Sequence, residues 1–97
     1  MQRKYLRLQE VTKICGVNVK FVTRLERERI ISSTIRRSQK VYPLDQVDRI
    51  RVARLLMEEM GVNLEGAEVA LHMREQMIAM QRQFSEILRR LGREFAR

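Results

Sequence analysis

An uninterrupted heptad pattern near the C-terminus most constrains the fold of this 97-residue chain. No glycine or proline interrupts residues 67–91. The pattern predicts one helix with a coiled-coil seam about 33 Å long, at ~1.5 Å per residue. The rest of the chain is too small to bury such a seam, so we expect a second copy to cover it; a helix folded back within the monomer is the alternative. Apolar residues recur at steps of three and four: Ala70, Met73, Met77, Met80, Phe84, Ile87 and Leu91.

A second feature, VTKICGVNVKFVTRLERERII at residues 11–31, is typical of two short helices joined by a tight turn. Gly16 can adopt the positive φ that ends the first helix, and Asn18 can cap the second. Val22 and Leu25 give the second helix an apolar side. Its polar side resembles that of a helix reaching into a DNA major groove, and a solvated basic face is the alternative. That side carries Lys20, Thr23, Arg24 and Arg27.

Residues 30–42, IISSTIRRSQKVY, predict a small β-hairpin, because β-branched residues surround polar turn formers. Ile35 and Val41 flank the polar stretch RRSQK, which we expect to form a basic tip. A hairpin directly after two such helices would be a wing whose tip contacts phosphates or the minor groove; a flexible surface loop is the alternative. Our candidates for base contacts in the major groove are Lys20, Thr23 and Arg24. Our other candidates are Arg36, Arg37 and Lys40 for wing contacts, Tyr42 for bracing the wing, and Lys13 and Arg27 for phosphate contacts.

Residues that begin or end helices divide the chain into two parts. Pro43 can begin a helix, and we expect this helix to end at Gly61 with an apolar face that includes Val47, Ile50, Val52, Leu55, Leu56 and Met60. Asn63 can cap the long helix that follows. We therefore predict a mainly α fold, with a winged helix-turn-helix head at residues 1–62 and a coiled-coil dimerisation helix at residues 63–97.

The charge lies in the first half of the chain. Residues 1–43 carry eleven lysines or arginines against three glutamates, a net charge of +8, whereas residues 44–97 carry nine basic and nine acidic side chains and are neutral. Concentrated charge of one sign opposes a compact fold, and an anionic partner relieves it. A basic head with a neutral tail favours nucleic acid over an anionic membrane, since the basic residues do not lie along one amphipathic helix.

The chain lacks the residues that several classes of function require. Cys15 and His72 are the only residues of their types, so one chain cannot assemble a structural zinc site, and we expect Cys15 to be a small buried hydrophobic residue. The four glycines form no phosphate-binding loop. We therefore expect no enzyme activity, metal or cofactor. The absence of a signal-peptide h-region and of a membrane-spanning apolar run leads us to expect a cytoplasmic protein.

With these parts in order, the chain resembles the MerR family of bacterial regulators over residues 5–80. The stretch GVNVKFVTRLERERII is similar to the family's Gly-Val, capping residue, Leu-Arg-Tyr-Tyr-Glu and Gly-Leu-Leu pattern. KVYPLDQVDRIRVARLLMEEMGVNLEGAEVAL is similar to its Arg-x-Tyr and its helix pair joined at a Leu-Gly-hydrophobic break. The departures are Thr23 for the usual recognition-helix Arg, Arg24 for the first Tyr, Arg29 for the Gly after that helix, and Lys40 for the wing Arg.

GVNLEGAEVAL resembles two small branches of that family, the heat-shock repressors and the chaperone modulators that bind J-domain co-chaperones. The resemblance implies a winged helix-turn-helix head that dimerises through its last helix, antiparallel to its mate, and that distorts a promoter operator in the DNA-binding members. The charge favours DNA, so we predict a homodimeric transcriptional regulator that binds duplex DNA, without a separate metal- or drug-sensing domain. The alternatives are a chaperone modulator that binds a J-domain and a phage-type architectural DNA-binding protein.

Overall fold

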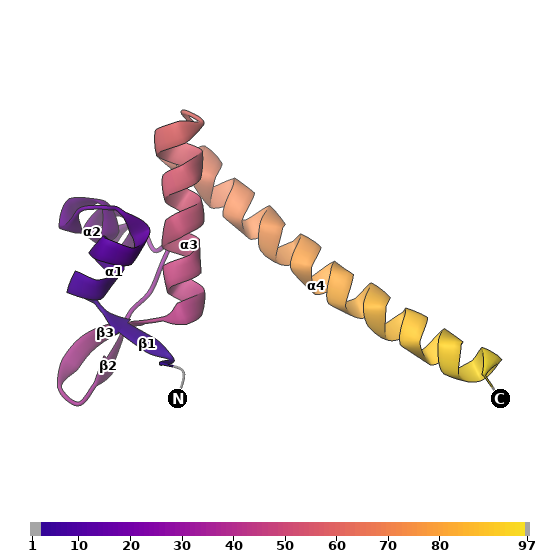
Figure 1. Cartoon of the computed structure of the whole chain (residues 1–97). Helices are drawn as coiled ribbons and strands as arrows, with labels where there is room; N and C mark the ends of the chain where they lie inside the picture. Colours follow the sequence, from indigo (N-terminus) through magenta and orange to yellow (C-terminus); the bar gives the residue numbers. More distant parts are fainter. Residues whose placement is uncertain (1–2, 97) are drawn as a thin grey trace.

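The computed structural model describes residues 3–96, which form a head followed by one long helix (Figure 1). The head combines short helices with a small sheet, and helix α4 (Leu64–Phe95) extends away from it as a rod. The prediction of a mainly helical chain with a small β element and a long C-terminal helix is confirmed. The coiled coil and the domain boundaries stay predictions, and residues 1, 2 and 97 lie outside the described part.

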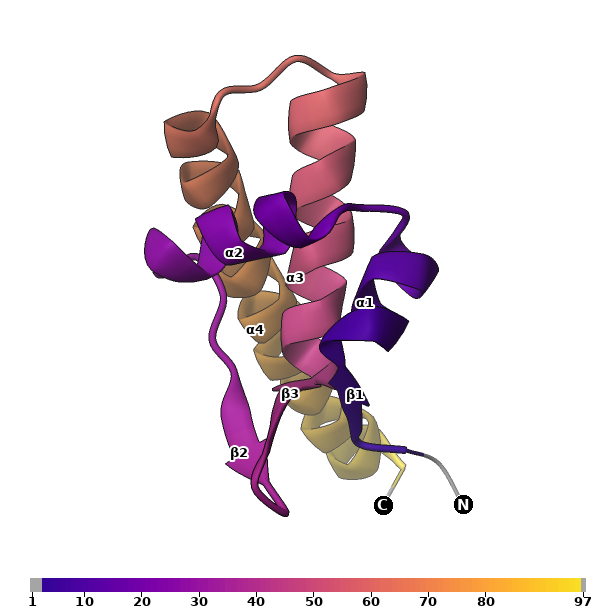
Figure 2. The same ribbon diagram turned by 90° about the vertical axis from the view of Figure 1, so that its left-hand side faces the viewer.

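Three short strands form an antiparallel sheet in the order β1-β3-β2. Strands β2 (Thr34–Arg36) and β3 (Gln39–Pro43) are the predicted hairpin, which extends beyond α1 and α2 in Figure 2. Strand β1 (Tyr5–Arg7) pairs with the other edge of β3, with Leu6 opposite Tyr42. The three-residue segment has too little alternation to be predicted as a strand by itself; its hydrogen bonds to β3 make it one.

Helices α1 (Leu8–Cys15) and α2 (Val19–Arg27) are joined by the predicted turn. Gly16 adopts a φ of 67°, and the Asn18 side chain accepts a hydrogen bond from the Phe21 amide at 2.8 Å. The apolar sides of both helices are buried in the core of the head, and Cys15 is buried there as predicted. The core residues are Leu6, Val11, Cys15, Val22, Leu25, Ile30, Ile31, Tyr42, Val47, Ile50, Ala53 and Leu71.

Helix α3 (Leu44–Arg54) continues into a π-helical turn, η1 (Leu55–Glu59), in which the Met60 amide donates to the Leu55 carbonyl at 3.1 Å. Gly61 follows with a φ of 71°, as predicted for the end of this segment. The prediction of one regular helix whose packed face includes Leu55 and Met60 was wrong, because these side chains are 46% and 65% exposed. A π-helical turn inserts extra backbone into each hydrogen-bonded ring, so the α-helical spacing of apolar positions no longer holds beyond it.

The first turns of α4 pack on α3. Asn63 caps α4 by accepting from the Gly66 amide at 2.8 Å, as predicted. Arg74 and Asp48 form an ion pair at 2.9 Å across the two helices, and Arg49 pairs with Glu75. Beyond Leu71, no described residue of α4 is buried, and Figure 1 shows the helix leaving the head, so it does not fold back.

Candidate nucleic-acid interface

Helix α2 presents the side that the sequence predicts for DNA. Because Val22 and Leu25 are fully buried, the helix can turn only its other side to solvent. All four candidate residues on that side are exposed: Lys20, Thr23, Arg24 and Arg27. The structure therefore brings these four residues together on one continuous surface.

The basic side chains of this surface have no acidic partner among the described residues. Within residues 3–96, no carboxylate forms an ion pair with Lys20, Arg24 or Arg27. The same is true of Lys13, which is exposed in the last turn of α1. Exposed cations without carboxylate partners keep their full attraction for an anion, whereas paired cations must first be released.

The hairpin ends in a turn tighter than predicted. We expected all of RRSQK to form the tip, but Arg36 pairs with Gln39 in the sheet, which leaves a two-residue turn of Arg37 and Ser38. These two residues have φ values of 52° and 64°, the pattern of a type I′ turn. The turn places Arg37 at the outermost point of the wing, and this side chain makes no ion pair with any described residue.

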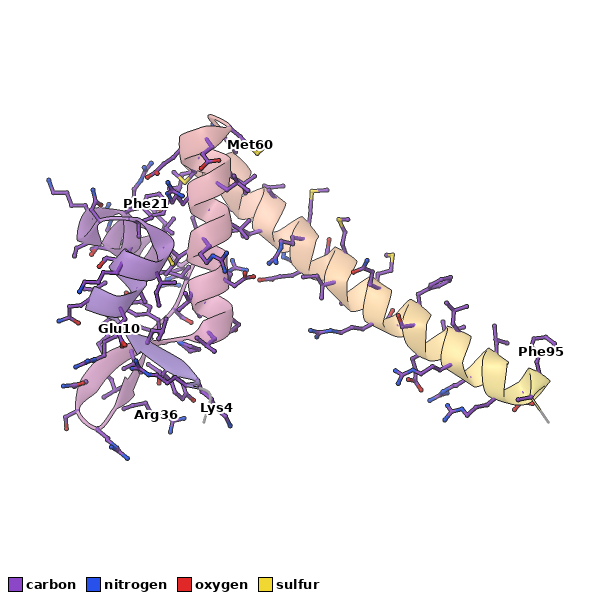
Figure 3. All side chains as sticks on the ribbon, in the orientation of Figure 1. Lys4, Glu10, Phe21, Arg36, Met60 and Phe95 are labelled. Atoms are coloured by element: carbon purple, nitrogen blue, oxygen red, sulfur yellow. The ribbon has the colours of Figure 1, made fainter. Side chains whose placement is uncertain are left out.

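The other two basic residues of the wing are held by neighbours. The Arg36 guanidinium lies 4.5 Å from the centre of the Tyr5 ring and donates to the Tyr5 hydroxyl, so it is fixed over β1. Figure 3 shows Arg36 near the bottom of the head, below Glu10. The Lys40 ammonium lies 2.7 Å from Glu26 of α2. Arg36 and Lys40 are therefore held by neighbouring side chains, whereas Arg37 makes no ion pair with any residue that the structure describes.

Tyr42 is buried rather than exposed to a ligand. Its side chain lies in the core at 2% exposure, and its hydroxyl donates to the Glu26 carboxylate at 2.9 Å. Burial, together with this hydrogen bond, raises the pKa of Tyr42. This placement fits the predicted bracing role and gives Tyr42 no direct access to DNA.

Glu26 is the functional candidate that the sequence reasoning missed. Its carboxylate accepts hydrogen bonds from Tyr42 and from the Ser33 hydroxyl, each at 2.9 Å, and pairs with Lys40. Burial raises the pKa of Glu26, but hydrogen bonds from Lys40, Tyr42 and Ser33 outweigh it, and the net pKa is lowered. Glu26 is therefore ionised at neutral pH. The available signal was its place at the end of the stretch that resembles Leu-Arg-Tyr-Tyr-Glu.

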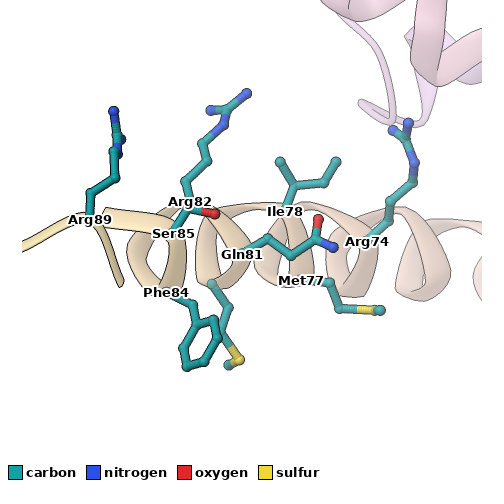
Figure 4. Close-up of a pocket in the computed structure, with 9 residues that line it drawn as sticks. Arg74, Met77, Ile78, Gln81, Arg82, Phe84, Ser85 and Arg89 are labelled. Atoms are coloured by element: carbon teal, nitrogen blue, oxygen red, sulfur yellow. The ribbon is translucent and has the colours of Figure 1, made fainter. Parts of the chain in front are cut away.

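The predicted dimerisation residues form an apolar stripe on α4. Figure 4 shows Met77 and Phe84 on one side of the helix and Arg74, Arg82 and Arg89 on the other. The sulfur atoms of α4 likewise project from one side of the helix in Figure 3. Apart from the half-buried Ala70, the seam residues are 48% to 68% exposed: Met73, Met77, Met80, Phe84, Ile87 and Leu91.

The described residues offer little for other chemistry. Within residues 3–96, no group of three or more histidine, cysteine, aspartate or glutamate side chains could hold a metal ion. None of the helices in the part of the chain that the structure describes is long and apolar enough to cross a membrane. The candidate site of the head is defined by the exposed basic residues of α2 and of the wing tip, and not by these two findings.

Comparison with known proteins assigns the chain to a family. A family model described as MerR HTH family regulatory protein matches residues 6–90, most of the chain. No curated protein and no solved structure gave a significant match. The matched range includes both helices of the helix-turn-helix, the wing and most of α4. The chain therefore belongs to the family of MerR helix-turn-helix regulatory proteins.

Proposed function

We propose that this protein is a transcriptional regulator that binds duplex DNA as a homodimer. The observation that carries the proposal is the set of exposed cations without ion-pair partners among residues 3–96. Arg24 of α2 would read a base edge in the major groove, and Lys13, Lys20 and Arg27 would contact phosphates. Arg37 at the wing tip would add a backbone or minor-groove contact.

Homodimerisation through α4 is the second part of the proposal. The exposed apolar stripe on a helix that leaves the head supports it, because water contact with such a stripe is unfavourable. A dimer also presents two copies of α2, which matches the two half-sites of a DNA operator. In this account residues 1–62 are the DNA-binding head, and residues 63–97 are the dimerisation helix.

Charge along α4 favours an antiparallel dimer. Residues 64–81 carry one arginine against three glutamates, a net charge of −2, and residues 82–96 carry four arginines against two glutamates, a net charge of +2. An antiparallel pairing places each acidic half beside the basic half of the mate, whereas a parallel pairing places like charges together. The centre of the seam would then lie near Met80, midway between Ala70 and Leu91.

The test is a titration of a fluorescent random-sequence duplex with Arg27→Ala and with Arg82→Ala. Arg82 is an exposed arginine of α4 without an ion pair among the described residues, so its variant removes the same charge outside the proposed DNA surface. Because Arg82 also belongs to the basic half of α4, light scattering should first show that both variants are dimers like the wild type. At about 0.1 M salt each phosphate contact raises the binding constant about eightfold over its value at 1 M salt, because log K changes by about 0.9 per contact for each tenfold change in salt. Losing one contact in each of the two heads should therefore weaken binding by the dimer about 60-fold. Arg82→Ala should bind like the wild type. Equal losses for both variants would contradict the proposed surface.

A further inference from the structure

Glu26 joins the recognition helix to the wing at three points. Its carboxylate contacts Ser33 before β2 and both Lys40 and Tyr42 on β3, at 2.7 to 2.9 Å. The Glu26 side chain is only 24% exposed, so water competes weakly for these contacts. Hydrogen bonds to an ionised acceptor are shorter and stronger than those between neutral groups.

No other polar link performs this task in the described chain. Among residues 3–96, every side-chain hydrogen bond or ion pair between α2 and the segment 33–43 passes through Glu26. The loop between them is attached to α3 instead. There the Ser32 amide donates to Gln46 at 2.9 Å, and Arg49 donates to the Ile30 carbonyl at 2.8 Å.

The free cations of the interface lie on both sides of this link. Arg24 and Arg27 lie on α2, and Arg37 lies at the tip of the hairpin, in the two-residue turn between β2 and β3. A rigid duplex can accept both groups only if the angle between α2 and the hairpin matches the spacing of its grooves. We propose that Glu26 is a positioning residue that fixes this angle and thereby couples base reading by α2 to backbone contact by the wing.

The inference rests on the proposed DNA-binding function. It also predicts that the ion pair between Glu26 and Lys40 lowers the affinity for DNA in general. Because Glu26 neutralises Lys40, the free protein has one phosphate-binding cation fewer on each head than its sequence suggests. Removing the carboxylate should release Lys40 and increase attraction for any duplex, while the loose wing reduces discrimination between duplexes. The two effects have opposite signs, which distinguishes positioning from general destabilisation.

The first experiment needs no DNA. Residual dipolar couplings of backbone amides would define the orientation of the hairpin relative to α2 in the wild type, in Glu26→Gln and in Glu28→Gln. Glu28 is exposed at the end of α2 without an ion pair among the described residues, so its variant removes the same charge from the same helix. The hairpin couplings should change or average in Glu26→Gln and should match the wild type in Glu28→Gln. Unchanged couplings in Glu26→Gln would overturn the proposal.

The second experiment compares a duplex enriched from a randomised pool with a scrambled duplex of the same length. Glu26→Gln should lose about tenfold or more in the ratio of the two affinities, the effect of one mismatched base pair. It should bind the scrambled duplex at least as tightly as the wild type, with a salt slope steeper by about 0.9 per chain. Glu28→Gln should shift both affinities by the same factor. A ratio unchanged by Glu26→Gln would contradict the coupling.

A third variant covers the case in which Glu26→Gln does not fold. Tyr42→Phe keeps every charge and the buried ring but removes one of the three contacts. It should lower the affinity ratio by a smaller factor and leave the salt slope unchanged, and an unaltered ratio would count against the proposal. If the wild type bound neither duplex while the couplings changed as expected, the DNA-binding function would be refuted and the geometric role of Glu26 would stand.

Discussion

Replacing Phe84 and Ile87 with glutamate should convert the protein into a monomer. In the single chain these side chains are 60% and 53% exposed, so a mate has about half of each to bury. Full burial of such a side chain is worth about 1.5–3 kcal/mol, so burying half of it contributes about 0.75–1.5 kcal/mol per position. Four positions per dimer give about 3–6 kcal/mol, or about two to four orders of magnitude in Kd. A dimer of micromolar affinity would therefore be mostly dissociated at micromolar concentration, and the cost of burying the carboxylates adds to this loss.

The assay is light scattering after size-exclusion chromatography at about 10 µM, where the monomer mass is 11.6 kDa. Ala79 and Ser85 provide the control, because both are exposed and lie outside the seam. Glutamates at these two positions add the same charge to the same helix and should leave the dimer intact. A native chain that is monomeric at this concentration would refute the seam, and dissociation of the control would show that charge alone explains the result.

Three further predictions concern backbone conformation and base reading. Arg29→Gly should stabilise the head by about 0.5–1 kcal/mol in urea unfolding, because Arg29 has a φ of 60°, and an unchanged midpoint would contradict this. Gly92→Ala should stabilise α4 by a similar amount, because nothing lies within 4 Å of the new methyl group. Gly66→Ala should destabilise α4, because its methyl group would lie 2.8 Å from the Val62 side chain and 3.0 Å from that of the N-cap Asn63. Equal effects of the two variants in thermal melts would be inconsistent with that contrast. Arg24→Ala should relax specificity at one base pair per half-site. Arg37→Ala should weaken the binding of all duplexes alike and lower the salt slope by about one per chain. If both variants lost the same factor of affinity on operator and scrambled duplexes, α2 would be excluded as the element that reads bases.

Local turn and cap chemistry made much of the fold predictable. Gly16 and Gly61 both adopt the left-handed backbone that their positions predict, and Asn18 and Asn63 both cap helices through their side chains. These signals need only neighbouring residues. The long helix was predictable for the same reason, because its apolar spacing continues without a break over residues 70–91.

Features without a local signal were missed. A type I′ turn usually contains Asn-Gly, so Arg37 and Ser38 gave no indication that the hairpin continues to them. The exposure of Leu55 depends on a π-helical turn that apolar spacing does not predict. The contact between Glu26 and Tyr42 joins residues 16 positions apart on different elements, so only the packed structure reveals it.

The salt dependence of duplex binding tests the proposed function most directly. Four phosphate contacts per head, from Lys13, Lys20, Arg27 and Arg37, make about eight contacts per dimer, so log K should fall against log salt with a slope near −7. A protein partner held by a small polar surface would give a much shallower slope. We expect tight binding of duplex DNA at about 50 mM salt and this steep loss of affinity at higher salt. No binding at low salt, or a flat response, would contradict it, and binding of a J-domain instead would favour the chaperone-modulator alternative.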